Sequence, residues 1–141
     1  MKLSKILAIA GKPGLYILSG QAKNGLLVEG IDDGKKFPVF SHERVSSLEE
    51  ISVFTEDQDM PLKEVFMAIK EKCNGEKAIN HKSSADQLKT FMGEAIPSYD
   101  RDRVYVSDIK KMISWYNLLQ ANELLDFEDE DNEENENSEN E

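Results

Sequence analysis

The stretch KNGLLVEGIDDGKKFPVFS, residues 23–41, decides the fold of the N-terminal part of the chain. The Asn-Gly pair at 24–25 is a strong hairpin signal, because a type I′ turn requires positive φ at both central residues. The Asp-Asp-Gly triplet at 32–34 repeats this turn chemistry between two apolar runs. Pro38 lacks a backbone N–H, so its strand is predicted at a sheet edge or at a bulge. The stretch therefore predicts two consecutive antiparallel hairpins.

Alternating apolar residues extend this strand pattern over residues 14–55. The two-residue spacing of half-buried strands occurs in three pairs: Leu15 with Ile17, Phe37 with Val39, and Ile51 with Val53. Several short strands at this spacing predict a small, strongly bent antiparallel sheet. We expect this sheet to form an SH3-like barrel.

The preceding stretch AIAGKPGLYILSG, residues 8–20, has the composition of a phosphate-binding loop. Such a loop must lead into a helix, whose N-terminus presents free N–H groups to the anion. Here a strand pattern follows the glycines, and residues 5–10 before them fit either a short helix or a strand. With either alternative the loop does not lead into a helix, so it is not predicted to bind phosphate. It is predicted to end one element and to start a strand at Leu15, leaving Lys12 as a surface charge.

Three helices are predicted after the polar segment TEDQDMP, residues 55–61. The first has apolar residues at 62, 65, 66, 69 and 73 on one face and a left-handed stop at Asn74-Gly75. The second opens at Ser83 or Ser84, both of which resemble capping boxes, and Pro97 ends it. The third is capped by Ser107 and carries a wide apolar face that includes Trp115.

The domain organisation predicted from these patterns has four parts. They are a small β-barrel domain at 1–55, a linker at 56–61, a helical domain at 62–125 and a disordered acidic tail at 126–141. The fold class is α+β. The tail contains ten of the 28 acidic residues and no basic ones, so residues 1–125 hold 18 acidic and 17 basic residues. The tail either keeps the protein soluble or competes with an anionic ligand for the protein's own basic surface.

Four separated blocks of the sequence carry a family resemblance. They are ILAIAGKPGLYIL (6–18), KNGLLVEGIDDGKKFPVFS (23–41), RVSSLEEISVFT (44–55) and RVYVSDIKKMISWYNLL (103–119). In this order they resemble a family of uncharacterised bacterial proteins catalogued as a domain of unknown function, over about residues 3–125. The resemblance implies a bacterial, intracellular protein and assigns no catalytic or binding residue.

Catalytic, metal and cofactor sites are not predicted. The chain has no Gly-x-Ser-x-Gly elbow, and the acidic pair at 32–33 lies in a turn where aspartate is expected for backbone reasons. Cys73 lies on an apolar helix face, and His42 and His81 lack the close ligand spacing of a structural zinc site. We therefore expect no enzyme, no metal and no cofactor.

A cytoplasmic location is expected. The lone cysteine cannot form an internal disulfide, and no segment approaches the ~20 apolar residues of a membrane span. The N-terminal apolar run at 6–10 is shorter than the roughly 7–15 residues of a signal-peptide core.

Basic and aromatic residues near the predicted turns are the candidate partner-binding residues. In the N-terminal part they are Tyr16, Lys35, Lys36, Phe40 and Arg44. In the helical part they are Arg101, Arg103, Tyr105 and Trp115. The function predicted is a non-catalytic interaction or regulatory module that binds a macromolecular partner, expected to be a protein. The alternative is a nucleic-acid-binding protein linked to translation or transcription, and an unrecognised enzyme is third.

Overall fold

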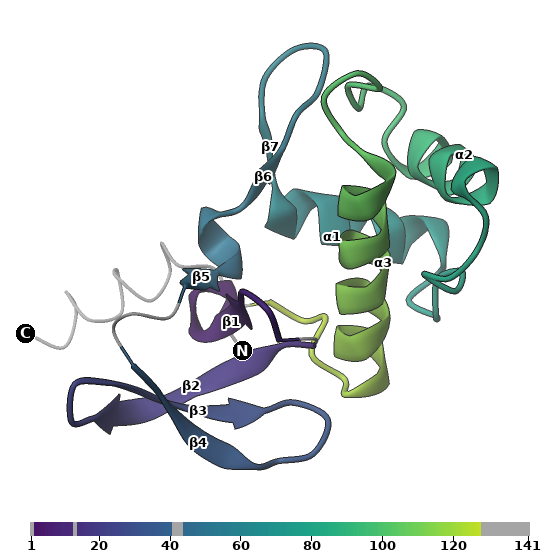
Figure 1. The fold of residues 1–141 in the computed structure, drawn as a ribbon. Helices are drawn as coiled ribbons and strands as arrows, with labels where there is room; N and C mark the ends of the chain where they lie inside the picture. Colours follow the sequence, from purple (N-terminus) through teal and green to yellow (C-terminus); the bar gives the residue numbers. More distant parts are fainter. Residues whose placement is uncertain (1, 13, 41–43, 128–141) are drawn as a thin grey trace, which may run out of the picture.

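The computed structural model describes residues 2–12, 14–40 and 44–127 of the 141-residue chain (Figure 1). The short 3-10 helices are η1 (Leu3–Lys5) and η2 (Leu48–Glu50). The strands are β1 (Ile6–Ile9), β2 (Tyr16–Ala22), β3 (Gly25–Gly30), β4 (Lys36–Phe40), β5 (Val45–Ser47), β6 (Ser52–Val53) and β7 (Met60–Pro61). The helices are α1 (Leu62–Lys72), α2 (Ala85–Ala95) and α3 (Val106–Ala121). The α+β class is confirmed.

The hairpin predicted at residues 24–25 is confirmed, but its turn comes one residue earlier. Ala22 pairs with Gly25, so Lys23 and Asn24 form the turn and Asn24 has φ +66°. Gly25 belongs to β3, where an added Cβ would collide with the carbonyl oxygen of Val39 on β4. The glycine is therefore needed for the close approach of the two strands.

The second hairpin, between β3 and β4, is also confirmed. Gly34 takes φ +68°, and the carboxylate of Asp33 accepts the N–H of Lys35 at 3.0 Å. The acidic turn residue thus has the backbone role that the sequence predicts. Pro38 lies in β4, an edge strand, as its missing N–H requires.

The five-stranded antiparallel sheet is open. Its order is β4-β3-β2-β1-β5, and among the described residues no ladder joins β4 to β5. The expected closure into an SH3-like barrel is therefore not formed by these strands. One reason is that residues 52–53, predicted in the barrel, leave the sheet and pair as β6 with β7.

The β6–β7 hairpin contacts the helical part of the chain. Thr55 bridges to Tyr99, Glu56 N–H donates to the Ser98 carbonyl at 2.8 Å, and Asp100 N–H donates to the Phe54 carbonyl at 3.0 Å. The segment predicted as a linker at 56–61 thus contains the hairpin turn and β7.

Helix ends follow local chemistry with one correction. Gly75 N–H donates to the Lys70 carbonyl at 2.8 Å with positive φ, which confirms the stop of α1. Ser84, rather than Ser83, caps α2 in a reciprocal box with Gln87.

The prediction that Ser107 caps the third helix is wrong. Tyr105 is the N-cap residue, and its N–H donates to the carboxylate of Asp108, three residues later in the chain, at 3.0 Å. The helix therefore begins at Val106, before Ser107.

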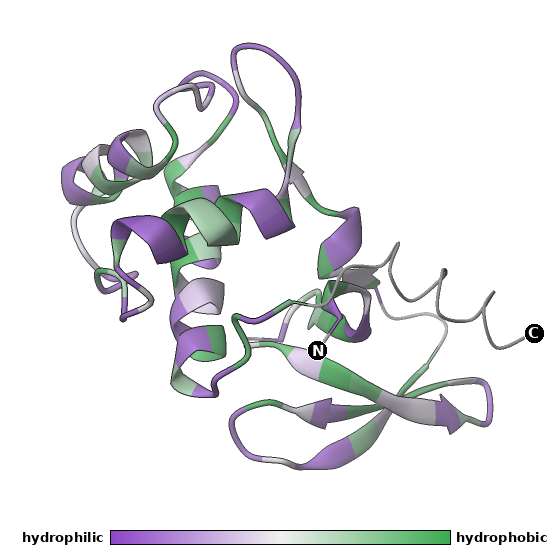
Figure 2. Ribbon diagram, turned by 180° about the vertical axis from the view of Figure 1, so that it is seen from behind, coloured by the Kyte–Doolittle hydropathy of each residue, from purple (hydrophilic) through white to green (hydrophobic). Residues whose placement is uncertain are grey.

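One large core joins the two parts of the chain. Ile6 of β1 and Leu48 of η2 are fully buried in the same cluster as Phe66 of α1 and Tyr116 of α3. A smaller cluster contains Leu7, Ile9, Val28 and Val39 of the sheet. Figure 2 shows hydrophobic and hydrophilic segments alternating along the helices, as expected of elements with one buried face.

The chain remains packed past the end predicted for the helical domain. The Phe127 ring stacks on the Phe66 ring with centroids 6.0 Å apart and planes 28° apart. Phe127, the second residue of the tail predicted as disordered at 126–141, is therefore packed, and residues 128–141 lie outside the described part. No helix among the described residues is long and apolar enough to cross a membrane.

Candidate functional site

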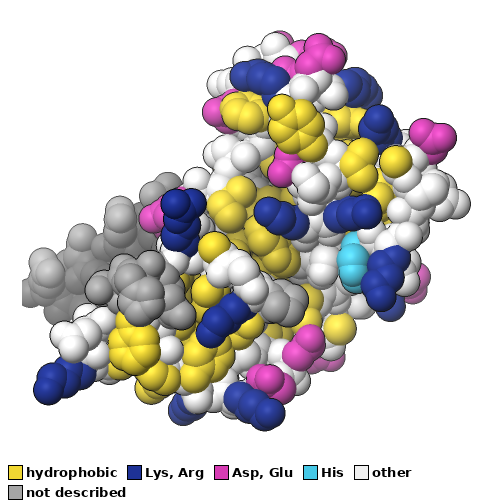
Figure 3. All heavy atoms as spheres, viewed as in Figure 1, with side chains coloured by type: hydrophobic (Ala, Val, Ile, Leu, Met, Phe, Trp, Pro, Cys, Tyr) yellow, Lys and Arg dark blue, Asp and Glu magenta, His cyan; other side chains and the backbone are white. Residues whose placement is uncertain are grey.

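A hollow of about 520 Å³ lies where the end of β1, the loop after it and the start of β5 face helix α3. We call it the basic groove. Its charged wall consists of Lys12, Arg44, Lys110 and Lys111, with His81 also in the lining. Its apolar wall consists of Ala8, Ile9, Ala10, Ile51 and Trp115, with Gly11, Gly14, Ser46 and Ser114 completing the lining. None of these described lining residues is acidic. Figure 3 shows Lys and Arg side chains around a hydrophobic strip on this face, beside a histidine.

Backbone hydrogen bonds hold the sheet side of the groove. The Ala10 N–H donates to the Arg44 carbonyl at 2.9 Å, and the Lys12 N–H donates to the Ile9 carbonyl at 3.1 Å. Gly11 and Gly14 both have positive φ, so the chain can turn sharply on either side of Lys12. The loop therefore carries a lysine into the groove, although it does not lead into a helix.

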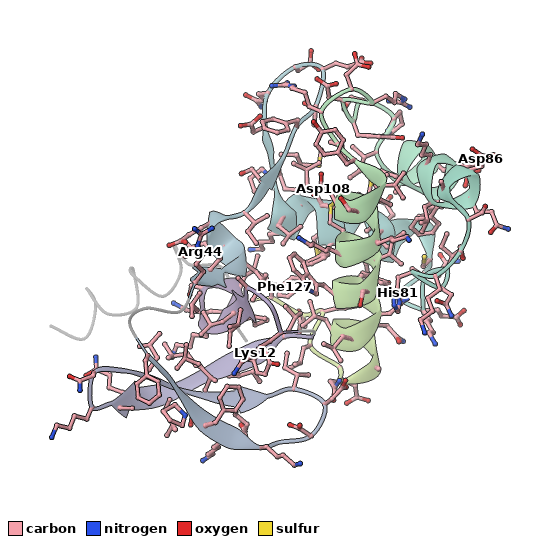
Figure 4. The ribbon with its side chains drawn as sticks, in the orientation of Figure 1. Lys12, Arg44, His81, Asp86, Asp108 and Phe127 are labelled. Atoms are coloured by element: carbon pink, nitrogen blue, oxygen red, sulfur yellow. The ribbon has the colours of Figure 1, made fainter. Side chains whose placement is uncertain are left out.

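Lys12 also contacts the sheet. Its ammonium nitrogen lies 4.4 Å from the centre of the Phe37 ring, and the Tyr16 ring meets Phe37 edge-on at 5.4 Å. This cation–π contact fixes the lysine stem at one end of the groove. Figure 4 shows Lys12 and Arg44 on one side of α3 and His81 on the other.

Helix α3 supplies the opposite wall. Lys110 and Lys111 are exposed, and Trp115 lies one turn after Lys111 and is half-buried. His81 reaches the groove because Asn117 of α3 holds the segment before it. The Asn117 Oδ1 accepts the Ala78 N–H at 2.7 Å, and its Nδ2 donates to the Ile79 carbonyl at 3.0 Å.

A second hollow of about 280 Å³ adjoins the groove and shares Ile51, Lys111 and Trp115 with it. We call it the Phe54 hollow, because it is bounded by the exposed Phe54 and by Arg103. The Arg103 guanidinium lies 4.3 Å from the centre of the Phe54 ring. One carboxylate, that of Asp108, is also in its lining.

Arg103 is partly neutralised by Asp100. Its Nε lies 2.7 Å from the Asp100 Oδ2, and this hydrogen bond lowers the pKa of that carboxyl. Arg103 therefore contributes a weaker field to the Phe54 hollow than an unpaired arginine would. Of the two hollows, the basic groove has the more positive described lining, with four Lys or Arg side chains and no carboxylate.

The structure brings together three of the nine residues predicted to bind a partner. Arg44 and Trp115 line the basic groove, and Arg103 lines the Phe54 hollow. The other six lie outside both hollows: Tyr16, Lys35, Lys36, Phe40, Arg101 and Tyr105.

Two of these six have structural contacts of their own. Tyr16 packs on Phe37, as described above. Arg101 lies 4.2 Å from the centre of the Tyr99 ring and donates to the carbonyls of Pro97 and Tyr99. Phe40 and Tyr105, with exposed fractions of 44% and 66%, lie on other parts of the surface.

The sequence leaves Lys12 as a surface charge in an architectural loop and considers His81 only as a metal ligand, so neither is among the nine predicted binding residues. Lys110 and Lys111 belong to a basic cluster of the sequence with Arg101 and Arg103, but interleaved aspartates dilute its charge, and the two lysines are not among the nine predicted binding residues. No local pattern could have joined them to Lys12, because about a hundred residues of chain separate the two walls.

The described residues contain no group of three His, Cys, Asp or Glu side chains placed to hold a metal ion. Burial raises the pKa of the Cys73 thiol, which favours the protonated form over the reactive thiolate. His42 lies outside the described residues.

Comparisons with known proteins agree with the sequence resemblance. Residues 3–48 match the family described as "Domain of unknown function (DUF5606)", and residues 51–119 match "Domain of unknown function (DUF6852)". None of the curated proteins matches the chain. A solution NMR structure from Bacteroides vulgatus, determined by the Northeast Structural Genomics Consortium, is 50% identical with a TM-score of 0.75. The match covers 89% of this chain and 90% of that one, and the chain therefore belongs to the same bacterial family.

Proposed function

We propose that the protein is a non-catalytic interaction module that binds a macromolecular partner by holding an anionic segment in the basic groove. The observation that carries this proposal is the lining of the groove. It gathers Lys12, Arg44, Lys110 and Lys111 around an apolar wall, and its described lining contains no carboxylate.

The strength of single surface contacts favours a ligand with several charges. An exposed ion pair is worth only about 0–1 kcal/mol, because water screens the charges and the side chains lose freedom. A small monovalent anion would therefore bind weakly to any one of these cations. A polymeric anion can contact several of them at once and pays the entropy of association only once.

The location of the titratable groups supports a binding role over a catalytic one. Catalytic sites gather groups whose pKa values are strongly shifted. The described groups with shifted pKa values are Asp100, Cys73 and Tyr116, and all three lie outside the groove. The groove instead presents the exposed Lys110 and Lys111 on α3, which suits reversible binding. We further propose a cytoplasmic location, because the chain has a single cysteine and can form no internal disulfide.

Charge reversal in the groove tests the proposal. The variant Lys110→Glu/Lys111→Glu changes the groove, and Lys23→Glu/Lys89→Glu changes the net charge equally at exposed sites outside both hollows. Binding of labelled polyglutamate, inorganic polyphosphate and short oligonucleotides would be followed by fluorescence anisotropy.

We expect at least one polyanion to bind, with a Kd that rises about tenfold or more in the groove variant and about threefold or less in the control. If none of the three binds the wild-type protein, or if both variants weaken binding equally, the groove is not the site.

A further inference from the structure

We infer that the anionic segment is a single strand of nucleic acid, and that Trp115 is the platform on which a base stacks between two phosphate-contacting hollows. This inference rests on the proposed function, because it names the ligand of the same groove. It starts from the position of one residue. Trp115 lines both the basic groove and the Phe54 hollow, so its indole lies where the two meet.

The cations are distributed on both sides of this indole. Lys12, Arg44 and Lys110 line the basic groove, Arg103 lines the Phe54 hollow, and Lys111 lines both. A phosphodiester strand that crosses Trp115 would keep positive charge beside it before and after the stacked base. Surfaces that bind single strands generally combine cationic side chains, which contact the phosphate backbone, with aromatic side chains, on which the bases stack.

The uncharged indole of Trp115 favours a ligand with nucleobases over one with acidic side chains. An acidic peptide would satisfy the lysines, but it would bring no flat ring to the half-buried indole. A base stacked on an aromatic side chain contributes about 1–3 kcal/mol. A duplex keeps its bases stacked on each other, so it could contact the cations but not the indole.

Two further residues, Phe54 and Asp108, determine how the strand would bind beyond Trp115. Phe54 is 42% exposed at the second hollow and offers another ring face, on which Arg103 already rests. Asp108 opposes phosphate at this end. Its carboxylate accepts the Tyr105 N–H at the start of α3, where the helix dipole offsets part of its charge. The strand should therefore bind most tightly at the basic groove and Trp115, and more weakly toward Phe54.

The chain contains a single tryptophan, so intrinsic fluorescence reports on this position alone. Oligothymidylate and oligouridylate should quench Trp115 fluorescence, and an abasic oligonucleotide of equal length should bind about tenfold more weakly without quenching. Trp115→Leu should lose about tenfold in affinity for the normal strand and little for the abasic one, while Trp115→Phe keeps most of the affinity. Circular dichroism and thermal melting would show whether each variant is folded, and the quenching needs no variant.

The outcomes separate the two proposals. Equal binding of normal and abasic strands, tighter binding of a duplex, or preference for polyglutamate would overturn the nucleic-acid inference while leaving the basic groove as an anion site. If no polyanion binds the wild-type protein, both the proposed function and the nucleic-acid inference are wrong. A preference between the thymidine and uridine strands would identify DNA or RNA as the ligand, and either result with quenching supports the inference.

Discussion

Asn117 on α3 accepts the backbone N–H of Ala78 at 2.7 Å, and this contact holds an irregular segment against the helix. The same side chain donates to the next carbonyl at 3.0 Å, so one amide satisfies two backbone groups. The segment leads directly to His81 at the rim of the basic groove. Asn117 thus connects the stability of the helical part with the shape of the candidate site.

Replacing Asn117 by alanine should lower the free energy of unfolding by about 1–3 kcal/mol, because two part-buried backbone groups lose their partner. Asn122→Ala is a matched control, since that exposed side chain makes one contact to the Leu118 carbonyl at 2.9 Å. We expect the control to change stability by about 0.5 kcal/mol or less. Urea denaturation of both variants measures the difference, and equal effects would contradict a clamping role for Asn117.

Phe127, the last residue that the structure describes, packs against the core. Its ring stacks on Phe66, which is fully buried, so Phe127→Ala should cost about 1–3 kcal/mol of stability through lost burial and ring contact. The neighbouring Asp126→Ala should have little effect, because Asp126 is exposed. Thermal or urea unfolding is the measurement. A chain truncated after residue 127 should match the full chain in stability, whereas one truncated after residue 126 should not. Equal stability of these two truncations would show that the ring does not anchor the chain.

Tyr116 predicts how stability changes at alkaline pH. Burial raises its pKa to about 12 from the usual 10.0, and its hydroxyl donates to the Glu76 carbonyl at 2.8 Å. Because the folded state holds the proton more tightly, this contribution is complete below pH 10 and is lost as the pH rises toward about 12. Tyr116→Phe should cost about 1–2 kcal/mol at neutral pH. The gap between wild type and variant should narrow as the pH rises through that window.

Urea denaturation at a series of pH values measures this gap. The other ionisable groups are common to both proteins, so their contributions cancel in the comparison. A gap that stays constant from neutral pH to the alkaline end of the window would mean that Tyr116 titrates alike in the folded and unfolded states.

Local sequence signals were sufficient for most of the elements. Glycine and asparagine at turns, the Ser84–Gln87 box and the apolar spacing of the helices act within a few residues, so one sequence reveals them. Local signals could not predict that residues 52–53 pair with β7 instead of joining the five-stranded sheet. The alternation of Ile51 and Val53 is compatible with any sheet, and contact with the helical part decides which partner the strand takes. Closure of a sheet into a barrel is likewise a tertiary property that alternation alone does not determine.

The candidate site was less accessible than the fold for the same reason. Arg44 and Trp115 could be selected by type, but their neighbours in the groove come from β1, α3 and the segment before α2. Lys35 and Lys36 have the same chemistry as Lys12, yet they lie outside both hollows. Residue type identifies candidates, and only the packing of α3 on the sheet determines which of them converge.

The acidic tail should weaken binding in the basic groove. Residues 128–141 contain nine acidic residues and no basic ones, so truncation after Phe127 changes the net charge from −11 to −2 and keeps the Phe66 contact. At about 50 mM salt, where screening is weak, the truncated chain should bind oligonucleotide severalfold more tightly. At about 0.5 M salt the difference should vanish, because the screening length falls to a few ångströms.

A tail of the same length with its acidic residues changed to glutamine and asparagine separates charge from bulk. It should bind as tightly as the truncated chain if repulsion or competition by the carboxylates is the cause. Anisotropy titrations at both salt concentrations provide the comparison. If the neutral tail weakens binding as much as the acidic one, the tail acts by steric exclusion. If truncation leaves the oligonucleotide affinity unchanged at low salt, the tail has no influence on the groove. Only a salt-dependent gain shared by the truncated and neutral-tail chains supports electrostatic control of the groove by the protein's own C-terminus.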